Sequence, residues 1–121
     1  MPDFKHRHHK DSLISALVGL KTAFRTQPNF KIMIVSTSVA IAAGISFRLS
    51  SVEWLVLVLI IGVVYLAEMI NTSIEAVVDL VTEEWRENAK IAKDVSGGMV
   101  LLSVILSIII GSLIFIPKLF S

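Results

Sequence analysis

Three long stretches of this 121-residue sequence carry almost no charge, and they constrain its fold more than any other feature. Residues 30–47 contain a single charged side chain, that of Lys31 at their edge, while residues 54–67 and 95–116 contain none. Hydrophobic residues make up 55% of the chain and charged residues only 17%, a balance too apolar for a soluble domain of this length. We therefore predict an all-α integral membrane protein with three transmembrane helices.

The segment before the first apolar stretch has the spacing of an amphipathic helix. Its apolar residues recur every three or four positions, and two basic residues are placed to reach anionic lipid headgroups. The apolar residues are Leu13, Leu17, Leu20 and Phe24, and the basic ones are Lys21 and Arg25. We predict an N-terminal surface helix on the inner leaflet, and Pro28 and Asn29 break the chain before it enters the membrane.

We treat residues 1–121 as one membrane domain, because this is the length of a single domain. The predicted segments are a mobile N-terminus over residues 1–10, the surface helix over 11–26, and membrane helices over 30–47, 53–79 and 94–116.

The distribution of basic residues predicts the orientation of these spans. Of the 11 lysines and arginines, six precede the first span or lie at its start and three lie in the second connection, while Arg48 and Lys118 fall on the other side. Cytoplasmic loops carry an excess of Lys and Arg, so the N-terminus and the second connection are predicted to be cytoplasmic and the C-terminus external. The net charge of +1 argues against nucleic acid as a partner.

Four polar residues, Glu68, Asn71, Glu75 and Asp79, follow the uncharged part of the second span; we call them the acidic stripe. At about 100° per residue, Glu75 and Asp79 lie within about 20° of Glu68 and Asn71 lies within about 60° of it, so the four share one helix face. A carboxylate in hydrocarbon costs on the order of 3 kcal/mol, so a retained line of them indicates a function. The alternative is that these residues are satisfied polar groups that join helices, and this alternative suits Asn71 or Asp79 alone better than the whole stripe.

The depth of the acidic stripe separates the tasks that its members can perform. If the second span starts near Val52, Glu68 lies about 24 Å along the helix, just inside a hydrocarbon layer of roughly 30 Å. A partly desolvated carboxylate there suits a general base acting on a lipid alcohol. Glu75 suits a hard cation such as Mg²⁺, which takes one or two carboxylates and leaves its other positions to phosphates and water. Asn71 can hydrogen-bond to either group, and Asp79 can orient a neighbouring basic residue.

Lys93 and Asp94 open the third span, and Gly97 and Gly98 follow one turn later. A lysine at the cytoplasmic edge is a point charge suited to a phosphate, and the glycines allow a phosphate or another backbone to approach closely. Each also has a structural interpretation, Lys93 as an interfacial anchor and the glycines as helix-packing positions. The sequence contains no GxxxxGK[ST], so any nucleotide site here is not a P-loop.

The run from Glu68 to Asp79 reads ExxNTxIExxVD, and it is followed by AKxxKD ending at Asp94. This combination resembles the prokaryotic diacylglycerol kinase family, and the likeness extends over about residues 12–118. Asn29-Phe30, Glu53-Trp54 and the IFIPK ending at Lys118 are similar to the Gram-positive branch, whose members often phosphorylate undecaprenol. The resemblance implies a three-span lipid kinase that uses ATP and Mg²⁺, with a surface helix and a homotrimer whose subunits share active sites.

The resemblance also implies roles for individual residues. Glu68 matches the catalytic base, Asn71 a site-organising asparagine, and Glu75 the glutamate that binds the metal and its nucleotide. Lys93 and Asp94 match nucleotide-binding residues. One departure concerns the metal: the family usually has a second metal-binding glutamate where this chain has Gln27. An amide oxygen can still ligate Mg²⁺, but without the charge, so weaker metal affinity is expected.

The sequence therefore predicts a multi-pass lipid kinase of the cell membrane that transfers the γ-phosphate of Mg-ATP to undecaprenol or diacylglycerol, with a slight preference for undecaprenol. Oligomerisation is expected on physical grounds too, because three short spans enclose a site poorly. Two rival functions are a small proton or cation pathway, in which the acidic stripe conducts, and a regulatory membrane subunit with no kinase activity. The ion pathway leaves Lys93 and Asp94 unexplained.

Overall fold

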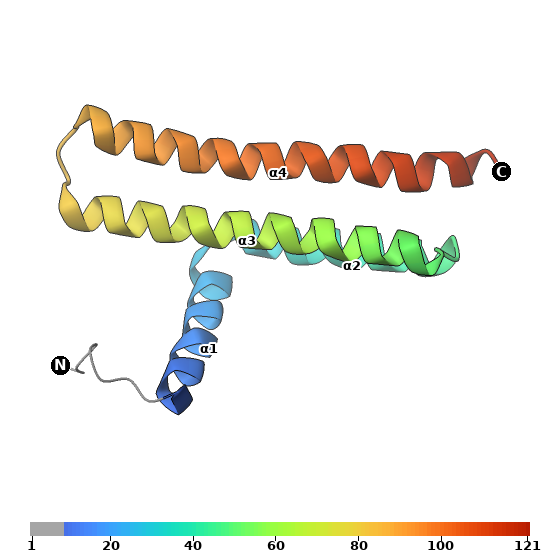
Figure 1. Cartoon of the computed structure of the whole chain (residues 1–121), viewed down its shortest axis with the longest axis horizontal. Helices are drawn as coiled ribbons and strands as arrows, with labels where there is room; N and C mark the ends of the chain where they lie inside the picture. Colours follow the sequence, from blue (N-terminus) through green and yellow to red (C-terminus); the bar gives the residue numbers. More distant parts are fainter. Residues whose placement is uncertain (1–8) are drawn as a thin grey trace. The chain divides into compact units, whose positions relative to one another are not determined.

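The computed structural model describes residues 9–121, and within this range all regular structure is α-helical (Figure 1). The helices are α1 (His9–Thr26), α2 (Pro28–Ser46), α3 (Ser51–Val81) and α4 (Glu87–Leu119). Of the predicted N-terminal segment over 1–10, the first eight residues lie outside the described part, and His9 and Lys10 belong to α1.

Three of these helices, α2, α3 and α4, are long and apolar enough to cross a membrane, which confirms the predicted all-helical chain with three candidate spans. α4 begins at Glu87, before the predicted start at residue 94. The added residues are polar, and a helix that continues into water beyond the bilayer needs no apolar side chains there. The described chain divides after Ile34 into two units.

The first unit holds α1 and the first turns of α2. The joint between the two helices is short: the amide of Gln27 donates to the carbonyl of Ala23 (3.1 Å), and the amide of Phe30 donates to the carbonyl of Gln27 (3.2 Å). Pro28 begins α2, a position where its missing N–H costs nothing. The rings of Phe24 and Phe30 pack at 4.8 Å between centroids, so a side-chain contact also stabilises this joint.

The second unit is built on α3 and α4, which lie side by side and run antiparallel (Figure 1). At the end where α3 begins, Ser50 and Glu53 form a capping box: the Ser50 hydroxyl accepts from the Glu53 amide, and the Glu53 carboxylate accepts from the Ser50 amide. The same carboxylate pairs with the Lys118 ammonium of α4 (3.1 Å). Phe47 and Phe115 pack edge to face at 5.9 Å nearby. This end of the pair is therefore held by charge, hydrogen bonds and aromatic packing together.

The apolar core lies at this same end. Its buried residues come from the turn before α3 and from both helices, and Trp54, Ala40 and Phe115 pack against them. They are Leu49, Leu57, Ile60 and Ile114. Further along the pair the buried positions become polar: they are Glu68 on α3, and Ser96 and Ser103 on α4. The face through which the helices pack therefore changes from apolar to polar along its length.

Gly44 of α2 sets how closely α2 approaches α3. A Cβ at this position would lie 2.6 Å from Cη2 of Trp54 and 3.1 Å from Cδ1 of Leu49. Beyond this point, the Thr37 and Tyr65 hydroxyls share a hydrogen bond of 2.9 Å between the same two helices. Glycine at position 44 therefore leaves room for the Trp54 indole, and a hydrogen bond joins the same two helices further along.

A single chain leaves most of its apolar surface uncovered. Only 17%, 22% and 11% of the most apolar windows of α2, α3 and α4 are buried. Exposed apolar surface on this scale is covered in a membrane by lipid or by other protein chains.

Replacement of Gly44 tests the contact between α2 and α3. Gly44→Ala places a methyl group against the Trp54 indole, and overpacking of this kind costs about 1–3 kcal/mol, so the thermal unfolding midpoint in detergent should fall. Gly19→Ala is the control, because a methyl group at that position would have no atom within 4 Å and alanine favours the helix. An unchanged midpoint in Gly44→Ala would contradict the close approach.

Candidate active site

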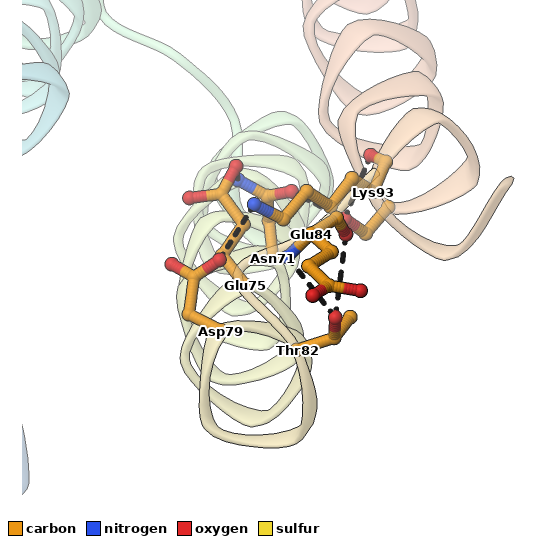
Figure 2. A network of polar contacts seen from close by, with 7 residues as sticks. Asn71, Glu75, Asp79, Thr82, Glu84 and Lys93 are labelled. Carbon is orange, nitrogen blue, oxygen red and sulfur yellow. Dashed lines mark hydrogen bonds and ion pairs between the residues drawn. The ribbon is translucent and has the colours of Figure 1, made fainter. Parts of the chain in front are cut away.

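The polar end of the second unit brings together residues from α3 and α4, and we call this group the polar cluster. Its members are Asn71, Glu75 and Asp79 of α3 with Lys93 and Ser96 of α4. Residues 82–86 connect the two helices, and so short a connection forces the last turns of α3 against the first turns of α4. Figure 2 shows the side chains of Asn71, Glu75 and Asp79 on one helix, with Lys93 reaching toward them from the other.

Lys93 makes an ion pair with Asp79 across the two helices. Its ammonium lies 2.7 Å from a carboxylate oxygen of Asp79, and the two side chains are 43% and 62% exposed. An exposed pair of this kind contributes about 0–1 kcal/mol to stability. The pair therefore holds the Lys93 ammonium beside the acidic stripe. Because the pair is weak, an anionic ligand can compete with Asp79 for the ammonium.

Asn71 and Ser96 form the second contact between the helices. The Ser96 hydroxyl lies 2.6 Å from Oδ1 of Asn71 and 3.0 Å from the carbonyl of Lys93. The Asn71 amide group in turn lies 3.5 Å from a carboxylate oxygen of Glu75, one turn along α3. Ser96 is almost fully buried, with 2% of its surface exposed, whereas Glu75 is exposed. Asn71 thus links a buried hydroxyl to an exposed carboxylate.

Glu68 lies on the same helix, deeper in the apolar part of the pair. Only 3% of its surface is exposed, and it neighbours the buried Ala67. From Glu68 to Asp79 the α3 axis advances by about 16 Å. The carboxylates of one helix therefore extend from a buried position at Glu68 to exposed ones at Glu75 and Asp79.

The other two residues predicted for the site have different surroundings. Asp94 follows Lys93 on α4 and pairs with Lys90 one turn away, in an open groove that also includes Glu84 and Arg86. Gln27 belongs to the first unit, at the joint between α1 and α2. Four of the seven predicted residues, Asn71, Glu75, Asp79 and Lys93, thus lie within one set of contacts.

The donor set of the cluster suits a hard cation. Glu75 supplies a carboxylate, a ligand type that Mg²⁺ prefers, whereas the Asn71 oxygen accepts from Ser96 and its NH₂ group faces Glu75. Among the residues that the structure describes, no group of three His, Cys, Asp or Glu side chains is arranged to hold a metal. These residues therefore fit a cation that takes its remaining ligands from phosphates and water.

Ser96 was not among the residues that the sequence pattern singled out. Ser96, Ser103 and Ile110 are spaced by seven residues along α4, and all three lie on its packing face. A heptad of small and apolar residues indicates a helix-packing face, and Ser96 stands one turn beyond Lys93 on it. That spacing was the available signal.

The chain is similar to known proteins over most of its length. Residues 14–115 match the prokaryotic diacylglycerol kinase family. An undecaprenol kinase of Bacillus subtilis is 38% identical over 108 residues, which cover 89% of this chain and 88% of that protein. A diacylglycerol kinase of Synechocystis is 39% identical over 107 residues (88% of this chain, 61% of that protein), and one of Escherichia coli is 28% identical over 91 residues (75% of each). Both the family match and the first of these relatives span most of the chain, and the protein therefore belongs to the prokaryotic diacylglycerol kinase family.

Proposed function

We propose that this chain, a membrane lipid kinase by family, transfers the γ-phosphate of Mg-ATP to the hydroxyl of undecaprenol or diacylglycerol, giving undecaprenyl phosphate or phosphatidic acid. The observation that carries the proposal is the course of α3, which joins the buried Glu68 carboxylate to the exposed polar cluster. A lipid alcohol reaches the first from the membrane and a nucleotide reaches the second from water.

In this mechanism Glu68 is the general base. Its buried carboxylate accepts the proton of the lipid hydroxyl while that oxygen attacks the γ-phosphorus, and the bond to the ADP oxygen breaks. Phosphoryl transfer depends mainly on positioning and on charge stabilisation, so the protein needs few reacting groups. Lys93 supplies positive charge to the phosphates, and Asp79 keeps its ammonium at the cluster until they arrive.

The metal belongs to the water-exposed part of the site. A Mg²⁺ ion bound there would supply positive charge to the phosphates. Glu75 supplies the carboxylate, and we propose Gln27 as a neutral second ligand and Asp94 as a further nucleotide contact. Asn71 organises the site by its contacts with Glu75 and Ser96.

The exposed apolar surface supports a homotrimer with shared active sites. The membrane helices bury little of themselves within one chain, and Leu13 and Leu17 of α1 are also exposed. We propose that partner subunits and lipid cover α2, α3 and α4, while α1 lies on the inner leaflet of the cell membrane. The connection at residues 82–86 is then cytoplasmic with the N-terminus, and the C-terminus is external.

The ion-pathway and regulatory-subunit alternatives are not favoured, because the family and its named relatives are kinases. The lipid substrate is either undecaprenol or diacylglycerol, and both lipids occur in the names of the relatives. The Gram-positive character of Asn29-Phe30 and of the IFIPK ending supports undecaprenol, and a test of activity must therefore offer both lipids.

Replacement of Glu68 tests the general base. With purified protein in mixed micelles, Mg²⁺ and γ-labelled ATP, we expect wild type to label undecaprenol or diacylglycerol and Glu68→Gln to lose at least about 100-fold in kcat. The amide has nearly the same size but accepts no proton. Glu87→Gln, an exposed carboxylate of α4, is the matched control and should keep wild-type activity. Labelled lipid at wild-type rate from Glu68→Gln would rule out this role, and no product from wild type with either lipid would refute the kinase.

Replacement of Gln27 tests the neutral metal ligand. Gln27→Glu adds the charge that a second metal ligand usually has, so half-maximal activity should need about 3- to 10-fold less Mg²⁺. Thr26→Glu adds the same charge to the adjacent exposed residue and should leave the Mg²⁺ requirement unchanged. An equal response of the two variants would show a general charge effect and exclude Gln27 as a ligand.

A further inference from the structure

The Ser96 hydroxyl faces two acceptors but has one hydrogen. Oδ1 of Asn71 lies 2.6 Å away across the helix pair, and the carbonyl of Lys93 lies 3.0 Å away on its own helix. A serine hydroxyl donates one hydrogen bond and can accept two. It therefore satisfies only one of these acceptors fully at a time.

The choice that Ser96 makes determines which end of the Asn71 amide faces Glu75. When Ser96 donates to Oδ1 of Asn71, the amide NH₂ points at the Glu75 carboxylate, at 3.5 Å. When Ser96 donates to the carbonyl of Lys93, its oxygen is free to accept from the Asn71 NH₂, and a half turn of the amide brings Oδ1 toward Glu75. Both arrangements leave the buried Ser96 hydroxyl with a hydrogen-bond partner.

The two arrangements have different chemistry at Glu75. An amide N–H beside the carboxylate neutralises part of its charge in the absence of a cation, whereas an amide oxygen there would repel it. A bound cation reverses this preference, because it attracts both oxygens. The contact of 3.5 Å between Asn71 and Glu75 is long for a hydrogen bond, so little is lost when it is given up.

We propose that Ser96 is a positioning residue whose hydroxyl allows the Asn71 amide to turn, presenting NH₂ to Glu75 without a divalent cation and a second oxygen ligand with one. The proposal rests on the proposed function of Glu75 in metal binding. It adds Ser96 as the residue that sets the orientation of Asn71, the neighbour of Glu75. Alanine at position 96 can neither donate to Oδ1 nor accept from NH₂. An unpaired amide N–H is less well tolerated than an unpaired amide oxygen, so the orientation that turns NH₂ toward position 96 and Oδ1 toward the cation loses more.

Ser103 provides a matched control on the same helix. It is also buried, with 4% of its surface exposed, and like Ser96 it contacts the carbonyl three residues earlier, that of Val100 at 2.7 Å. Among the described residues, its hydroxyl makes this hydrogen bond within α4 and none to α3. Ser103→Ala therefore removes a buried hydroxyl and a local bond without touching Asn71.

The experiment measures Mn²⁺ binding to the full-length protein in detergent micelles by electron paramagnetic resonance, with a non-hydrolysable ATP analogue present. We expect Ser96→Ala to weaken Mn²⁺ binding about 5-fold or more, and Ser103→Ala to leave it within about 2-fold of wild type. Ser96→Thr keeps the hydroxyl and should restore the affinity. In activity assays, Ser96→Ala should raise the Mg²⁺ concentration for half-maximal rate by a similar factor, with kcat at saturating Mg²⁺ nearly unchanged.

The outcomes separate this proposal from the kinase function. Equal Mn²⁺ affinity in wild type and Ser96→Ala, an equal loss in Ser103→Ala, or no Mn²⁺ binding by wild type would overturn the role of Ser96, even if the lipid is phosphorylated normally. A clear loss of Mn²⁺ affinity confined to Ser96→Ala would uphold it, even if wild type phosphorylates neither lipid. Thermal unfolding of each variant shows whether threonine fits the buried site at position 96. If it does not fit, the comparison of Ser96→Ala with Ser103→Ala still tests the proposal.

Discussion

Hydrocarbon offers no partner to a polar group, so every polar side chain within a membrane helix must find one inside the protein. The second unit meets this constraint through the antiparallel pairing of α3 and α4 across the short connection at residues 82–86. That pairing brings Asn71 to Ser96 and Asp79 to Lys93, although these residues are 25 and 14 positions apart in the sequence. Without the pair, Asn71 and Asp79 of the acidic stripe would lack the partners that α4 supplies.

The same helix pair packs through apolar residues at one end and through small and polar residues at the other. Apolar contacts around Leu57, Ile60 and Ile114 stabilise one end. The other end uses small and polar residues, which stabilise it less and leave its carboxylates accessible. Glu68 lies where the first kind gives way to the second, so a buried carboxylate next to Ala67 shares a helix with the exposed carboxylates of Glu75 and Asp79.

The sequence was sufficient for the features that depend on composition and on helical spacing. Long uncharged runs predicted three candidate spans, and the 3.6-residue period placed Glu68, Asn71, Glu75 and Asp79 on one face. The sequence was not sufficient for features that depend on how the residues of one helix are aligned with those of its neighbour. The approach of Ser96 to Asn71 follows from how α4 is aligned against α3, and a serine in an apolar helix carries no mark of its partner. Gln27 was identified by family pattern alone, and its role in the site stays a prediction.

The clamp formed by Glu53, Lys118 and the Phe47–Phe115 contact has a mechanical consequence for the opposite end of the helix pair. α3 is a continuous helix, and from Glu53 to Asp79 its axis extends about 39 Å at roughly 1.5 Å per residue. A tilt of about 3° at the clamped end, acting over that length, displaces Asp79 by about 2 Å. A small tilt at this end is therefore amplified along α3, and it changes the separation between Asp79 and its partner Lys93 on α4.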